Sequence, residues 1–150
     1  MPTSGNKPEL LVDTSVAVAL VVSDHQFHQL TIESLDGRRL GLAGHAAFET
    51  FSVLTRLPPP ARRTPAVVAR LMTANFCENR FLSPEGATEL LARFGEGEIA
   101  GGSVYDALVG ATAVEHGLAL ATLDRRALDT YRVLGVSVEV LAPGRHQDLR

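Results

Sequence analysis

The sequence contains little cysteine, almost no lysine and no apolar run long enough to cross a membrane. Its single cysteine, Cys77, excludes an internal disulfide and a thiolate-rich zinc site. The longest apolar run, Val16 to Val22, is far shorter than the roughly 20 residues of a membrane-spanning helix. The polar N-terminal stretch, MPTSGNKPE, carries no apolar signal segment. We therefore expect a cytoplasmic protein that does not associate with a membrane.

The chain also lacks an excess of positive charge. Its formal net charge is −3 at pH 7, and Lys7 is the only lysine. Proteins that coat nucleic acid without sequence preference are usually basic, because neutralising phosphates supplies most of their affinity. The charge therefore excludes a nonspecific nucleic-acid coat. It does not exclude an enzyme acting on nucleic acid, since an acidic metal site can offset a local basic rim.

The length and the hydrophobic pattern predict one α/β domain. The chain has 150 residues, of which 45% are hydrophobic and 21% are charged, and this suits a single globular core. We expect the core to span about 9–142, followed by a polar tail at 143–150. Short apolar strands alternate with helical segments, which predicts a parallel sheet covered by helices on both faces. The strands are expected at 10–12, 38–44, 118–124 and 136–143, with a weak candidate at 79–83, and the helices at 15–20, 24–37, 45–57, 64–76, 83–95, 103–117 and 124–135.

Two acidic residues follow predicted strands. Asp13 comes directly after Leu10–Val12, and Asp124 closes the strand predicted at 118–124. In open parallel sheets, ligands bind beyond the carboxyl ends of the strands, where loops lead into helices. Aspartate is also a preferred helix N-cap, and each of these residues precedes a helix. At either site taken singly, a ligand-binding role and a purely structural cap are equally good interpretations.

Asp106 lies in a predicted helix, 103–117, that is apolar on nearly every side. On a helical wheel it shares a face with Val109, Gly110 and Ala113. An isolated ionised carboxylate inside a protein is costly unless it is paired, protonated or bound to a metal. The alternative is a capping box, with Ser103 as the N-cap and Asp106 three residues later. The small residues on its face leave room for a ligand, so we favour the functional interpretation.

Glu49 gives the weakest signal, since it lies at the edge of the apolar arc of its helix and alone predicts a solvated side chain. However, three or four carboxylates converging at one end of a sheet would repel one another unless a cation lay between them. Oxygen ligands without a cysteine or histidine cluster suit Mg²⁺ or Mn²⁺. His25 and His28 have a spacing that a metal could use, but surface positions are favoured. Such a magnesium site serves phosphoryl chemistry.

Four stretches occur in order over about 9–142, and they are LLVDTSV, AFETFSVLTRL, SVYDALVGATAVEHGLALATLDRRAL and VSVEVL. In these stretches the chain resembles the PIN-domain family, and in particular the ribonuclease toxins of bacterial VapBC toxin–antitoxin pairs. The resemblance implies a three-layer α/β/α fold with a central parallel sheet. The long third stretch is the most specific, because an aspartate after a strand is common on its own.

The resemblance implies that four acids form the catalytic pocket, and these are Asp13, Glu49, Asp106 and Asp124. Asp13 and Asp106 are expected to bind the metal, Mg²⁺ or, as an alternative, Mn²⁺. Glu49 and Asp124 complete the pocket directly or through water. Small hydroxyl residues are expected to order the site, and they are Thr14, Ser15 and Thr122.

The same resemblance implies a Mg²⁺-dependent endoribonuclease toxin that leaves a 3′-hydroxyl and a 5′-phosphate. A homodimer, neutralised by a cognate VapB-type antitoxin, is expected, with the helices at 45–57 and 24–36 as contact surfaces. Arg125 is expected to contact phosphate or to pair with a pocket acid. The alternative is a PIN-like module that binds RNA or the antitoxin with little turnover. Dependence on a divalent cation discriminates between the two.

Overall fold

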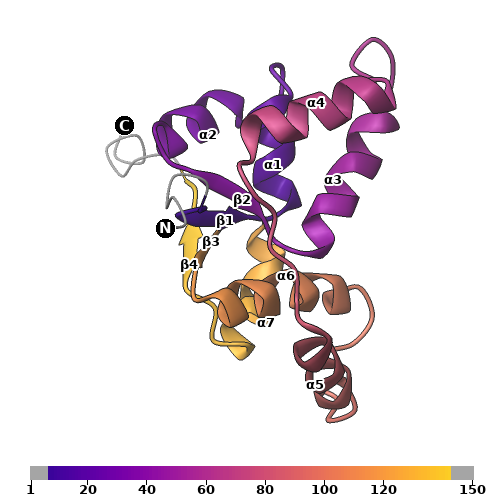
Figure 1. The fold of residues 1–150 in the computed structure, drawn as a ribbon, viewed down its shortest axis with the longest axis vertical. Helices are drawn as coiled ribbons and strands as arrows, with labels where there is room; N and C mark the ends of the chain where they lie inside the picture. Colours follow the sequence, from indigo (N-terminus) through magenta and orange to yellow (C-terminus); the bar gives the residue numbers. More distant parts are fainter. Residues whose placement is uncertain (1–6, 143–150) are drawn as a thin grey trace, which may run out of the picture.

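A computed structural model of the chain describes residues 7–142, and it is built on a four-stranded parallel sheet (Figure 1). The order of the strands is β2-β1-β3-β4, and neighbouring strands are parallel throughout. This confirms the predicted parallel α/β fold; the strand predicted at 10–12 has those bounds, and the other three strands are shorter than the pattern suggested. The strands are β1 (Leu10–Val12), β2 (Leu40–Leu42), β3 (Ala119–Thr122) and β4 (Val138–Val140).

Helices cover both faces of this sheet, so the domain has three layers. Figure 1 shows α1 to α4 on one side of the sheet and α5 to α7 on the other. Helix α1 packs on β1 and β3, and α6 packs on β3 from the opposite side. The helices are α1 (Thr14–Val21), α2 (His28–Leu35), α3 (His45–Thr55), α4 (Pro65–Asn75), α5 (Pro84–Phe94), α6 (Ser103–His116) and α7 (Leu128–Val133), with a 3₁₀ turn, η2, at Arg125–Ala127.

Two predicted helices are shorter than their sequence patterns. The helix expected at 24–37 begins only at His28, and the helix expected at 124–135 is divided into η2 and α7. The polar tail predicted at 143–150 lies outside the described residues. Within residues 7–142, no helix is long and apolar enough to cross a membrane.

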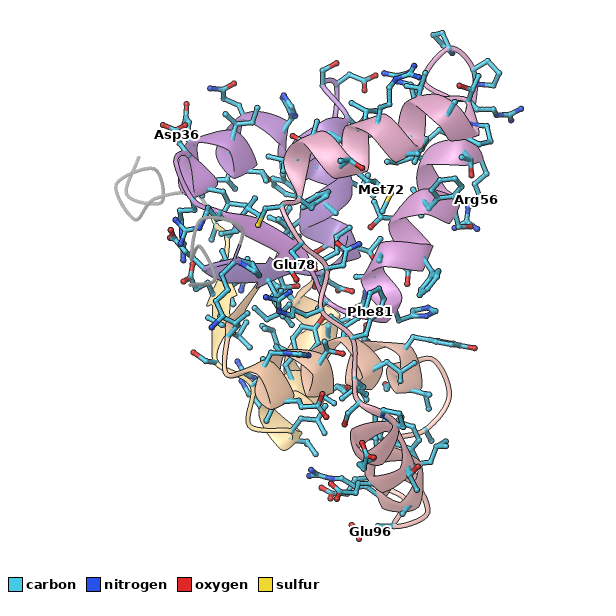
Figure 2. The ribbon with its side chains drawn as sticks, in the orientation of Figure 1. Asp36, Arg56, Met72, Glu78, Phe81 and Glu96 are labelled. Atoms are coloured by element: carbon cyan, nitrogen blue, oxygen red, sulfur yellow. The ribbon has the colours of Figure 1, made fainter. Side chains whose placement is uncertain are left out.

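The weak strand candidate at 79–83 forms only an isolated bridge, between Arg80 and Ala43. The segment around it nevertheless runs along the edge of β2, because the Cys77 amide donates to Leu40 and the Arg80 amide donates to Leu42. Figure 2 shows this segment, marked by Glu78 and Phe81, descending from α4 past the sheet toward α5. Its backbone lies so close to β2 that a Cβ at position 41 would lie 2.3 Å from the Glu78 carbonyl oxygen, and position 41 is glycine.

The core consists of the strands and the apolar faces of the helices packed on them. All of β1 is buried, and Val12 lies opposite Leu42 on one side and Ala121 on the other. Because β1 and β3 are adjacent and parallel, their carboxyl ends open on the same edge of the sheet. That edge holds the two acids predicted to follow strands.

Candidate active site

Asp13 lies at the junction of β1 and α1 and is only 5% exposed. It is the N-cap of α1, and its carboxylate accepts a hydrogen bond from the Val16 amide at 3.2 Å. The structural interpretation of this residue is therefore correct. The side chain also accepts hydrogen bonds from Thr122 and Tyr131, which lie outside helix α1.

Both oxygens of Asp13 accept two hydrogen bonds each. Oδ1 accepts from Ser15 Oγ at 2.5 Å in addition to the Val16 amide. Oδ2 accepts from Thr122 Oγ1 and, at 2.9 Å, from the hydroxyl of Tyr131. Burial raises the pKa of Asp13, while these hydrogen bonds lower it, and burial is the larger effect. Four donors hold one carboxylate in a single orientation.

The hydroxyls of Ser15 and Thr122 also hold the loop that carries Asp124 in place. The Leu123 amide donates to Ser15 Oγ at 2.9 Å, and the Asp124 amide donates to Thr122 Oγ1 at 3.0 Å. Asp124 in turn caps η2 by accepting from the Arg126 amide at 3.0 Å. Ser15 and Thr122 therefore connect the two strand ends, as the resemblance implied for these positions.

Asp106 does not take part in a capping box. Helix α6 begins at Ser103, its N-cap is Gly102, and no side chain of residues 7–142 caps it. The capping alternative is therefore wrong for this residue. Partial burial, followed by the nearby carboxylates of Asp124, Asp13 and Glu49, raises the pKa of Asp106 to about 6.

Glu49 lies on α3 with its side chain 44% exposed, as its position on the helical wheel predicted. Its carboxylate lies 3.6 Å from His45 Nε2, one turn earlier on the helix. The ring of His45 stacks on Tyr105 of α6 at a centroid distance of 4.8 Å. Glu49 is thus half-exposed, but it faces the same cavity as the other three acids.

All four predicted acids line one open cavity of about 380 Å³. They come from the end of β1, from α3, from α6 and from the loop after β3, so the fold brings together residues that are distant in sequence. Arg126 also lines the cavity, whereas Arg125, the residue expected to contact phosphate, does not. His25 lines the cavity too, while His28 binds the carbonyl of Ala19, so the two histidines do not form a metal pair.

The donor set of this cavity fits a magnesium-type ion. Among residues 7–142, no three acidic, histidine or cysteine side chains are close enough together to ligate one ion by themselves. Mg²⁺ usually takes only one or two carboxylates and keeps several waters, so this spacing suits it better than an ion that demands a protein cage. A cation between the acids would also relieve the repulsion that, after burial, raises the pKa of Asp106.

Tyr131 is a site residue that the sequence pattern did not predict. It lies on α7, it is 1% exposed, and its hydroxyl reaches Asp13. In the sequence it reads as one more core residue of a helix that ends at Gly135. The signal that could have drawn attention to it is the glycine of α6, Gly110, against which its ring packs.

A three-layer α/β/α domain with four acids around a cavity at the strand ends defines a narrow class of protein. The family model described as the PIN domain matches residues 10–133. The chain belongs to the PIN-domain family, as the sequence motifs indicated.

Relatives in the same family cover nearly the whole chain. Ribonuclease VapC27 of Mycobacterium tuberculosis (strain ATCC 25618 / H37Rv) is 47% identical over 136 residues, which are 91% of this chain and 99% of the relative. Ribonuclease VapC40 of Mycobacterium tuberculosis (strain CDC 1551 / Oshkosh) is 44% identical over 133 residues, which are 86% and 96% of the two chains.

Solved structures share the fold at much lower sequence identity. One is VapBC2 from Rickettsia felis bound to a DNA fragment from their promoter, with a TM-score of 0.63, 14% identity and coverage of 89% of this chain and 98% of that one. Another is the sarcin-ricin loop cleaving toxin VapC20 of Mycobacterium tuberculosis, with a TM-score of 0.57, 16% identity and coverage of 76% and 87%. These likenesses agree with the three-layer architecture.

Proposed function

We propose that the protein is a Mg²⁺-dependent endoribonuclease toxin that is neutralised by a cognate VapB-type antitoxin. The observation that carries the proposal is the gathering of Asp13, Glu49, Asp106 and Asp124 around one cavity. The identity of 47% with a relative named as a ribonuclease supports the reaction class. Such an enzyme would meet its RNA in the cytoplasm.

Asp13 and Asp106 are the residues that would hold the ion. Asp13 is the more rigid of the two, because four donors fix its carboxylate. Asp106 is held by its helix and accepts no hydrogen bond from the described residues, so both its oxygens are free. When bound, Mg²⁺ (or Mn²⁺) would polarise a phosphodiester oxygen and lower the pKa of a water molecule.

The charge of the cavity explains why RNA cleavage there would depend on a cation. Four acids face the cavity and one cationic side chain, Arg126, lines it, so an RNA phosphate would be repelled by the protein alone. Arg126 is placed to contact phosphate, and its guanidinium matches phosphate geometry. Glu49 and Asp124 would complete the cavity directly or through water. The attacking group is then water, and no side chain forms a covalent bond to the substrate.

The family also implies a homodimer and an antitoxin that covers apolar surface. Phe48 on α3 is 67% exposed, and Ile32 on α2 is 39% exposed, so both helices expected to contact partners present apolar side chains. A purified chain that elutes at twice its mass, and a dimer that binds the antitoxin encoded beside it, would support this part of the proposal.

The experiment that tests the activity is cleavage of total RNA by the full chain, with Mg²⁺ or with a chelator. The test variant is Asp106→Asn, which keeps the shape of the side chain but removes its charge. The matched control is Asp129→Asn on α7, whose side chain is 96% exposed and bonded only to Arg132. We expect discrete Mg²⁺-dependent cuts by the wild type and the control. The rate of RNA cleavage by Asp106→Asn should fall by more than about 100-fold. Replacing a residue that only hydrogen-bonds to a metal ligand already costs about 10–100-fold in metal affinity or activity.

Two results would contradict the proposal. Equal cleavage by all three proteins would remove Asp106 from the reaction. RNA that is bound but not cut, with or without Mg²⁺, would favour the alternative of a binding module with little turnover.

A further inference from the structure

We propose that Tyr131 is a positioning residue that fixes Asp13 relative to Asp106, and so sets the spacing of the two residues that would hold the cation. This inference rests on the proposed function. It concerns a residue outside the four acids, on a helix, α7, that carries none of them.

The first observation is the contact itself. The hydroxyl of Tyr131 donates to Asp13 Oδ2 at 2.9 Å, and the side chain is 1% exposed. A buried tyrosine hydroxyl needs a partner, and here the partner is the most buried acid of the cavity. A phenol hydroxyl that faces a carboxylate can only act as the donor of the hydrogen bond, so the direction of this contact is fixed.

The second observation is that Tyr131 belongs to a different element from the other side-chain donors to Asp13. Ser15 and Thr122, the other side-chain donors to Asp13, lie within two residues in sequence of Asp13 and of Asp124, at the start of α1 and at the end of β3. Tyr131 comes instead from α7, beyond η2. Its hydrogen bond therefore connects the end of β1 to a different element, one that packs against α6.

The third observation is the packing of the Tyr131 ring against α6. A Cβ at Gly110 of α6 would lie 3.1 Å from Tyr131 Cδ1, 3.0 Å from Val136 Cγ2 and 3.3 Å from Leu134 Cδ1. Glycine at this position allows the ring to lie directly on the helix backbone. Asp106 is four residues earlier on the same helix, and residues four apart share a helix face.

Together these contacts connect Asp13 to the helix that carries Asp106. The ring of Tyr131 rests on α6 one turn from Asp106, and its hydroxyl holds Asp13. Loss of the hydroxyl would leave Asp13 with its three other donors and so keep it buried and capped. It would remove the restraint that ties Asp13 to the helix of Asp106.

The test is the affinity of the full chain for Mn²⁺, measured by titration calorimetry at fixed pH without RNA. The variant is Tyr131→Phe, which removes only the hydroxyl. The control is Thr73→Val on α4, which also removes a hydroxyl, because this hydroxyl donates to the Ala69 carbonyl of its own helix and Thr73 does not line the cavity. We expect the Kd of Tyr131→Phe to rise by about 10-fold, as for other partners of metal-binding carboxylates. The control should stay within about twofold of the wild type.

A structural role for Tyr131 alone would lower the melting temperature without changing the Kd for Mn²⁺. An unchanged Kd in folded Tyr131→Phe therefore overturns the inference and leaves the proposed function intact. Wild-type protein that binds no Mn²⁺ would overturn both the inference about Tyr131 and the proposed function. If Tyr131→Phe does not fold, Gly110→Ala decides, because it keeps the hydroxyl but displaces the ring. A Kd several-fold higher supports the inference, and an unchanged Kd refutes it.

Discussion

Replacing Asp106 by asparagine should make the metal-free protein more stable at neutral pH. Burial and three neighbouring carboxylates raise the pKa of Asp106 from 3.8 to about 6 in the folded state. A carboxyl group with a raised folded-state pKa stabilises the fold only while it is protonated, so stability falls as pH rises from about 4 to above 6. Asparagine is neutral at every pH and has nearly the same size and shape as aspartate.

The size of this gain in stability follows from the rise in the pKa of Asp106. A shift of about two pH units corresponds to about 3 kcal/mol for a fully buried group, at 1.36 kcal/mol per unit. Asp106 is only partly buried, and solvent screens its repulsion by the other acids, so we expect about 1 kcal/mol. In a chain of this length that is about 2–4 °C in the melting temperature.

The assay is urea or thermal unfolding of the wild type and Asp106→Asn in chelator, at pH 7.5 and at pH 4.5. The variant should be more stable at pH 7.5, and the difference should shrink by more than half at pH 4.5, where the folded wild type is protonated at this site. Excess Mn²⁺ should then stabilise the wild type and not the variant. An Asp106→Asn variant that is equally or less stable at pH 7.5 would refute the idea that the acids crowd this residue.

Two further substitutions test the framework around the site. Gly44→Ala should lower the free energy of unfolding by about 1–3 kcal/mol, because Gly44 has a φ of +51° and an added Cβ would lie 2.7 Å from Thr112 Oγ1. Urea unfolding measures it, and a neutral result would contradict the strain argument. Arg38→Ala should cost less than about 1 kcal/mol, although Arg38 makes two hydrogen bonds to Glu139, because both side chains are about a third exposed. A loss of several kcal/mol would show that this ion pair is far better shielded than its exposure indicates.

Much of the fold was predictable because its signals are local. Apolar strands alternating with helices indicate a parallel sheet, and an aspartate after a strand must lie at its carboxyl end. Asp13 and Asp124 could therefore be placed at the same edge before the structure was known. The late start of the helix expected at 24–37 was not predictable from its apolar spacing, because helix α2 begins only at His28, after a loop in which the Phe27 amide donates to His25 Nδ1.

The convergence of the acids depends on tertiary contacts that no local pattern encodes. Glu49 alone predicted a solvated side chain, and the position of α3 beside α6 is what turns it toward Asp106. Only the resemblance to a known family placed it in the site. Tyr131 was missed because a tyrosine in an apolar helix usually signals core packing, and its partner is 118 residues away. The catalytic roles of the four acids stay predictions.

The most direct test of the account is a crystal of the chain soaked in Mn²⁺ and measured at a wavelength where manganese scatters anomalously. The account predicts a peak within about 2.5 Å of a carboxylate oxygen of both Asp13 and Asp106. The same peak should be absent from crystals of Asp106→Asn. A peak elsewhere on the protein, or no peak in a cavity open to solvent, would contradict the assignment of these acids as the cation site.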